Sequence, residues 1–151
     1  MNYNQSYYQN NKENILQRSS ENQKRRYKED LQFKLLKRLQ ARINKELPEY
    51  NATIEELLRC SLSFFVKWIK FNIPNNNITR SNMDNIHLHH VRPIGTFAQS
   101  SKTQALHWTN IYPIDKHENL SIKDTRNLNE EEQQRKRVYN FLLATELSSN
   151  E

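Results

Sequence analysis

Glycine is almost absent from this chain, and its scarcity limits the folds that the chain can adopt. Gly95 is the only glycine among 151 residues. Phosphate-binding loops and dinucleotide-binding turns need several glycines, because their backbones turn tightly and approach the ligand closely. An all-β sandwich needs glycines in its many turns. The sequence therefore argues against both groups of folds.

Size and composition indicate one small domain with a tail. The hydrophobic fraction is 35%, below the roughly 45–50% of an average globular protein, so we expect a small core. The single cysteine, Cys60, excludes an intramolecular disulfide and a cysteine-rich zinc site. Because neither a signal peptide nor a long apolar run is visible, we expect a soluble intracellular protein, in cytoplasm or nucleus, without a membrane segment.

The chain divides into three segments. Residues 1–20 are polar and aperiodic, and we expect a disordered polar arm there. Residues 21–80 are predicted to be helical and basic, with one helix over 21–46 and a second from Thr53 to about Asn72. Thr53 and Glu56 fit a capping box, in which the hydroxyl and the carboxylate each accept a backbone N–H of the first turn.

The first of these helices carries much of the positive charge. Lysine and arginine exceed aspartate and glutamate by 23 to 17, a net charge of +6, which favours polyanionic partners. The apolar stripe of the helix consists of Leu31, Leu35, Leu36, Leu39 and Ile43. Its other faces include Lys34, Lys37, Arg38 and Arg42. These four side chains belong either to a solvated helix face or to a surface that contacts phosphates.

The third segment, residues 81–151, alternates between strand and helix patterns. Strands are predicted over Ile86–Val91 and over Trp108–Ile114. A short helix is expected from Glu118 to Asp124, with Asp115 as a possible cap, and a last helix over about 129–147. The expected architecture is α+β: N-terminal helices, a strand–strand–helix unit and a C-terminal helix.

All five histidines lie between His87 and His117, and three of them stand in the tetrapeptide His87-Leu88-His89-His90. Histidine titrates near neutral pH and is the commonest metal ligand in proteins. Chemistry is therefore expected in the strand–strand–helix region, rather than elsewhere in the chain.

This region resembles the HNH, or ββα-metal, endonuclease family, and in particular its phage and large-virus members. Family strands typically read His-Ile-Asp-His-Ile-x-Pro and Thr-Asn-Leu-x-Pro-Leu, and the helix reads Glu-Asn-Leu-x-Lys. The matching stretches here are His87-Leu88-His89-His90-Val91-Arg92-Pro93, Thr109-Asn110-Ile111-Tyr112-Pro113-Ile114 and Glu118-Asn119-Leu120-Ser121-Ile122-Lys123.

The resemblance implies a role for each matching residue. His90 would be the general base of phosphodiester hydrolysis, and Asn110 would fix the hairpin and the His90 ring. One divalent metal ion would be held by His89 and by Asn119. Nucleic-acid contacts would come from Arg92, Lys34, Lys37, Arg38, Arg42 and Lys123. The implied substrate is DNA, with RNA as the weaker possibility.

The chain departs from the family pattern at His89, where aspartate is common. An imidazole ligand suits Zn²⁺, Ni²⁺ or Mn²⁺ better than Mg²⁺, so the identity of the metal stays open among these four. Two other functions also stay open. One is an HNH-like protein that binds nucleic acid or serves a structural role without cleavage, and the other is a helical interaction module with a structural zinc ion.

Overall fold

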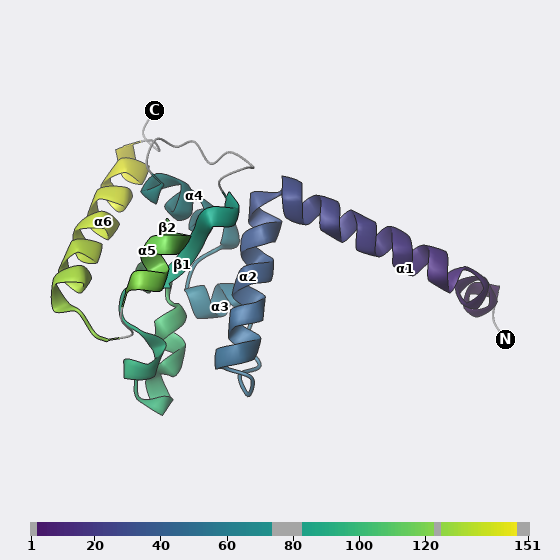
Figure 1. Cartoon of the computed structure of the whole chain (residues 1–151), viewed down its shortest axis with the longest axis horizontal. Helices are drawn as coiled ribbons and strands as arrows, with labels where there is room; N and C mark the ends of the chain where they lie inside the picture. The colour runs from purple at the N-terminus through teal and green to yellow at the C-terminus, as the bar shows by residue number, and fades with distance from the viewer. Residues whose placement is uncertain (1–2, 74–82, 123–124, 148–151) are drawn as a thin grey trace.

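A computed structural model describes residues 3–73, 83–122 and 125–147, and it confirms the α+β class. The described residues are mostly helical and contain one antiparallel hairpin (Figure 1). The helices are α1 (Tyr3–Glu29), α2 (Leu31–Glu46), α3 (Ile54–Leu58), α4 (Leu62–Asn72), α5 (Lys116–Ser121) and α6 (Leu128–Leu147). The strands are β1 (Ile86–His90) and β2 (Ile111–Asp115), and short 3₁₀ segments join them.

The N-terminal prediction is wrong for the residues that the structure describes. Residues 3–29 form one helix, α1, which extends away from the packed part of the molecule (Figure 1). The segment contains neither glycine nor proline, and side chains bond along the helix, as between Gln17 and Glu21 at 3.0 Å. Since the helix is polar on all sides, it lacks the apolar periodicity by which a helix is recognised in sequence. No helix in the described ranges has the length and apolar character needed to span a membrane.

Each of the two predicted N-terminal helices is interrupted. Asp30 separates α1 from α2 and caps α2, because its carboxylate accepts the Phe33 N–H at 3.0 Å. The capping box at Thr53 and Glu56 is confirmed, with Thr53 N 2.7 Å from the Glu56 carboxylate. The helix that it starts ends at Arg59, whose φ of 60° lies in the left-handed region, and Ser61 caps α4.

The core lies between α2, α4, α6 and the hairpin. Its largest fully buried side chains are Trp68, Phe65 and Phe141. The Trp68 ring packs edge-on against Trp108 and Phe141, with centroids 5.3 and 5.2 Å apart. These contacts join α4 to α6 and to the 3₁₀ segment just before the second strand. Cys60 is half-buried beside this core, and its burial raises the pKa of the thiol to about 11.

Helices hold both outer edges of the hairpin. The two strands pair with His89 opposite Tyr112 and His90 opposite Ile111. On the outer edge of β1, Arg38 and Arg42 of α2 donate to the carbonyls of Ile86 and Leu88 at 2.6 and 2.9 Å. On the outer edge of β2, the indole of Trp68 donates to the Ile111 carbonyl at 2.6 Å. The hairpin is therefore fixed between α2 and α4.

We predict that Trp68→Phe will lower the free energy of unfolding by about 2–4 kcal/mol. The change leaves the buried Ile111 carbonyl without its donor, which costs about 1–3 kcal/mol, and also removes core volume. Urea denaturation followed by circular dichroism measures the effect. Tyr139→Phe, at an exposed position of α6, is the control and should change stability by less than about 0.5 kcal/mol. Equal stability of the two variants would contradict the anchoring role of Trp68.

Candidate functional site

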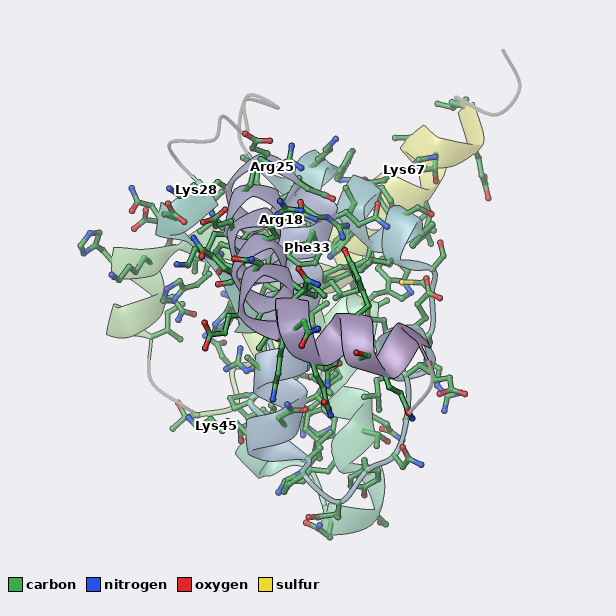
Figure 2. All side chains as sticks on the ribbon, turned by 90° about the vertical axis from the view of Figure 1, so that its right-hand side faces the viewer. Arg18, Arg25, Lys28, Phe33, Lys45 and Lys67 are labelled. Atoms are coloured by element: carbon green, nitrogen blue, oxygen red, sulfur yellow. The ribbon has the colours of Figure 1, made fainter. Side chains whose placement is uncertain are left out.

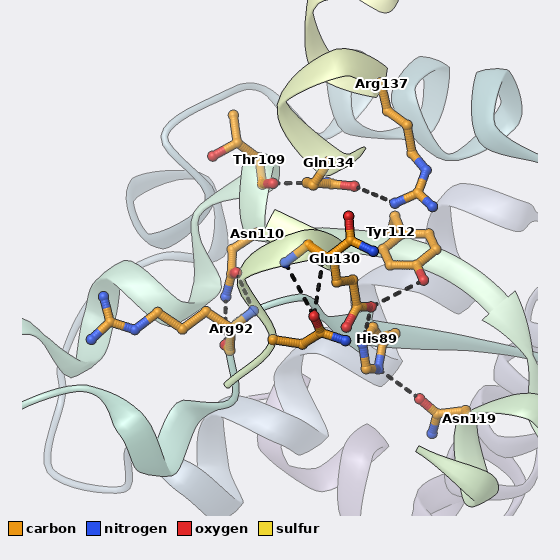
Figure 3. Close-up of polar contacts among 11 residues, drawn as sticks. His89, Arg92, Thr109, Asn110, Tyr112, Asn119, Glu130, Gln134 and Arg137 are labelled. Atoms are coloured by element: carbon orange, nitrogen blue, oxygen red, sulfur yellow. Dashed lines mark hydrogen bonds and ion pairs between the residues drawn. The ribbon is translucent and has the colours of Figure 1, made fainter. Parts of the chain in front are cut away.

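His89 lies between two polar partners from different helices (Figure 3). Its Nδ1 is 3.1 Å from Asn119 Oδ1 on α5, and its Nε2 is 2.9 Å from Glu130 Oε1 on α6. The residue is buried, with 9% of its surface exposed. The structure thus brings together the two predicted metal ligands, and it adds a carboxylate that the sequence did not indicate.

The short helix α5 places Asn119 over the first strand. Asp115 ends β2 and caps α5, because its carboxylate accepts the His117 N–H at 2.7 Å, as predicted for this residue. Asn119 therefore follows the strand by one helical turn. Its Nδ2 also lies 3.2 Å from Nδ1 of His87, which shares a strand face with His89. The three polar side chains form one group on that face of β1.

The separation of His89 Nδ1 and Asn119 Oδ1 fits the binding of one cation. Two ligand atoms that each lie about 2.1–2.2 Å from the same ion are about 3.0–3.1 Å apart when the angle between them at the ion is 90°. The measured separation is 3.1 Å. The described residues contain no group of three or more His, Cys, Asp or Glu side chains that could hold a metal. A cation here would therefore depend on the amide oxygen as well as on imidazole.

His90 lies on the opposite side of the strand and is buried, with 6% of its surface exposed. Within the described part of the chain, its Nε2 atom is buried without a hydrogen-bond partner. Burial, followed by the charge of Arg42 and by His89, lowers the pKa of the imidazole to about 3. His90 is therefore a neutral ring at physiological pH, with a buried nitrogen that other described side chains do not use.

Two neighbouring hollows of about 310 and 320 Å³ border this group. Both are lined by Arg42, Leu88, His90 and Asn119. The first also includes His89, and the second includes His87. The predicted ligands and the predicted base thus border the same pair of hollows between α2, β1 and α5, although the strand directs His89 and His90 to opposite sides.

Asn110 fixes the open end of the hairpin. Its Oδ1 accepts the Arg92 N–H at 2.9 Å, and its Nδ2 donates to the carbonyls of Arg92 and Ala105 at 3.0 and 2.9 Å. These bonds agree with the predicted role in holding the hairpin. None of the hydrogen bonds described for Asn110 reaches the His90 ring, so control of that ring stays a prediction.

Most of the predicted nucleic-acid contacts bind within the protein instead. Lys34 is buried and pairs with Asp84 of the short turn just before β1, so the prediction of a phosphate contact there is wrong. Arg38 and Arg42 hold the edge of β1. Arg92 donates to the Thr96 carbonyl at 3.0 Å.

The other two predicted contacts are Lys37 and Lys123. Lys37 is exposed, with its ammonium 5.4 Å from the centre of the Phe33 ring. Further exposed basic residues lie along α1, including Arg18, Arg25 and Lys28, which Figure 2 shows from the side on which α1 projects. Lys123 lies outside the described residues.

Glu130 was missed because the glutamates at the start of the last helix matched the usual preference for acid near a helix N-terminus. A weaker signal is nevertheless present. Glu130 shares one face of α6 with Gln134 and Phe141, which are 4% and 2% exposed. A glutamate at the start of a buried stripe is positioned to face the core, and it reaches a residue 41 positions earlier.

The chain is similar to two proteins of Acanthamoeba polyphaga mimivirus. It is 34% identical to the uncharacterized protein L246 over 137 residues, which cover 87% of this chain and 60% of that protein. It is 28% identical to the uncharacterized protein L426 over 128 residues, which cover 82% of this chain and 56% of that protein. The chain thus spans less than two thirds of the length of these relatives. No family model and no solved structure matches it.

We predict that His90→Leu will leave the free energy of unfolding unchanged or raise it by up to about 2 kcal/mol. Leucine removes a buried nitrogen that lacks a partner, and such a change is nearly neutral or stabilising when the shape is retained. Urea denaturation in the presence of a chelator measures the free energy of unfolding of the variant and of the unmodified protein. His117→Leu, at an exposed position, is the control. If His90→Leu lowers the free energy of unfolding by more than about 1 kcal/mol and His117→Leu does not, the His90 ring stabilises the fold.

Proposed function

We propose that the protein is a metal-dependent endonuclease of the HNH type that hydrolyses phosphodiester bonds of DNA inside the cell. The observation that carries the proposal is the contact of 3.1 Å between His89 on the first strand and Asn119 on the following helix. The buried, unpartnered nitrogen of His90 lies on the adjacent strand position. The order strand, strand, helix agrees with the resemblance read from the sequence.

His90 would act as the general base. Hydrolysis requires a group that takes a proton from the attacking water, and a neutral imidazole can do so near pH 7. Burial keeps the His90 ring neutral and lowers its pKa to about 3 in the protein without ligands, so the ring is a weak base until substrate and water reach it and raise its basicity. Substrate and water would have to reach the ring from the hollows that it borders.

His89 and Asn119 would hold one divalent cation. When bound, the cation would act as a Lewis acid that stabilises negative charge on the leaving oxygen. Imidazole as a ligand favours Mn²⁺, Ni²⁺ or Zn²⁺ over Mg²⁺. Glu130 accepts a hydrogen bond at the other ring nitrogen of His89, an arrangement that is common around metal-binding histidines.

Arginines of α2 would supply positive charge beside the scissile phosphate. Arg38 and Arg42 line the hollow that also contains His87 and His90. A guanidinium has five N–H donors, so an arginine that binds a strand carbonyl still brings its charge to the hollow. The net charge of +6 and the basic residues of α1 would contribute attraction that does not depend on DNA sequence.

One observation favours an alternative, a protein that binds nucleic acid without cutting it. His90 is only 6% exposed, so a substrate must displace neighbouring groups to reach it. Such a protein would retain binding to DNA while no metal ion supports cleavage. The assay below distinguishes the two functions, because binding and cleavage are measured on the same samples.

We predict that the purified chain will cut plasmid DNA with at least one of Mg²⁺, Mn²⁺, Zn²⁺ or Ni²⁺, and that His90→Ala will lower the rate by about 10²–10⁴-fold. Asn119→Ala should lower the rate at limiting metal and recover partly at high metal. His117→Ala, which changes an exposed histidine of α5, should stay within about twofold of the unmodified protein. Gel electrophoresis of plasmid and of single-stranded RNA measures cleavage, and a mobility shift measures binding.

Two outcomes would remove the endonuclease assignment. One is binding of DNA without cleavage under all four metal ions. The other is equal cleavage by His90→Ala and the unmodified protein. Faster cutting of RNA than of DNA would correct the substrate and retain the reaction.

A further inference from the structure

The carboxylate of Glu130 is held within the site by three elements. Its Oε1 lies 2.9 Å from His89 Nε2 on β1 and accepts the Tyr112 hydroxyl of β2 at 3.3 Å (Figure 3). Its backbone N–H donates to the Asn127 side chain at 3.3 Å, at the start of α6. The side chains of Glu130 and His89 are 16% and 10% exposed. The contact is therefore largely shielded from water.

The anchoring of α6 fixes where this carboxylate lies. One turn after Glu130, the amide of Gln134 donates to the Thr109 carbonyl at 2.8 Å, just before β2. Further along the helix, Phe141 is buried in the core. Tyr112 stands opposite His89 in the hairpin, and its ring meets the imidazole edge-on at 5.4 Å. Glu130 is thus held against His89 by packing on both sides.

The contact with Glu130 keeps a proton on Nε2 of His89. A carboxylate offers only acceptor oxygens, so the bond at 2.9 Å requires a proton on Nε2. The other ring nitrogen, Nδ1, faces a second acceptor, Asn119 Oδ1, at 3.1 Å, so without a cation this contact is a hydrogen bond only when Nδ1 also carries a proton. A cation at this position would replace the Nδ1 proton, while Nε2 keeps its own.

We propose that Glu130 is a positioning residue that keeps a proton on Nε2 of His89, so that Nδ1 is the ring nitrogen that can bind the cation. Its carboxylate also places a negative charge beside the imidazole. A carboxylate behind a metal-binding imidazole makes the ligand more basic and fixes its ring. The inference rests on the proposed function, because it assigns Glu130 a part in the same metal site.

Two measurements on the full chain test this role. Long-range ¹⁵N–¹H NMR of histidine-labelled protein at pH 7.5, without metal and with Zn²⁺, reports which ring nitrogens of His89 carry a proton. Calorimetric titration with Zn²⁺ alone reports the affinity of the site. The variants are Glu130→Ala, which removes the acceptor, and Glu130→Gln, which keeps an acceptor oxygen but removes the charge. Glu132→Ala is the matched control, because Glu132 is an exposed glutamate of the same helix that pairs with Lys136.

We expect His89 of the unmodified protein to carry a proton on Nε2 both without and with Zn²⁺, and the proton on Nδ1 to be absent when Zn²⁺ is bound. Glu130→Ala should lose the preference for a proton on Nε2 and raise the Kd for Zn²⁺ by about 10–100-fold. Glu130→Gln should keep the proton on Nε2 and bind Zn²⁺ with intermediate affinity. Glu132→Ala should match the unmodified protein in both measurements.

The results separate this inference from the proposed function. Unchanged protonation of Nε2 and unchanged Zn²⁺ affinity in Glu130→Ala, with weakened Zn²⁺ binding in Asn119→Ala, would overturn the role of Glu130 and support the metal site. A His89 whose Nε2 carries no proton in the unmodified protein would also overturn it, because Glu130 would then have no N–H to accept. Loss of the Nε2 preference in Glu130→Ala without any Zn²⁺ binding would support the positioning of His89 and count against the proposed endonuclease.

Discussion

The hairpin depends on hydrogen bonds that helices donate to its two outer edges. A two-stranded sheet is marginally stable alone, and each of its edges leaves carbonyl groups without a partner. Here Arg38 and Arg42 bind the edge of β1, and Trp68 binds the edge of β2. Because these bonds fix the hairpin between α2 and α4, the site residues on its strands keep a defined orientation. Residues that look like a DNA-binding surface in the sequence therefore serve first to hold the sheet.

The elements that local signals define were predictable from the sequence. The capping box at Thr53, the cap at Asp115 and the alternation along the first strand are local signals, and the structure has all three. The second strand begins at Ile111 and not at Trp108, because residues 108–110 form a 3₁₀ turn. The helical state of α1 was not predictable from periodicity, since that helix buries no apolar face of its own. The break at Arg59 was equally hidden, because it depends on a left-handed residue that is not glycine.

For the site, the sequence indicated the residues of the hairpin and α5 but not those of the surrounding helices. His89 and Asn119 are 30 positions apart and were recognised because a family pattern links them. The contacts of Lys34 with Asp84 and of His89 with Glu130 span 50 and 41 positions and match no such pattern. They follow from the packing of α2 and α6 on the hairpin, which only the fold reveals. The burial of Lys34 and the inward position of Glu130 are two results of that packing.

The position of Glu130 also bears on when the site becomes complete. Both strands and α5 precede α6 in the chain, so during synthesis His89 leaves the ribosome well before the carboxylate that contacts it. If Glu130 positions His89 as proposed, a nascent or truncated chain holds an unfinished site. Under the proposed function, the metal site of such a chain would bind its cation more weakly until α6 has packed on the hairpin.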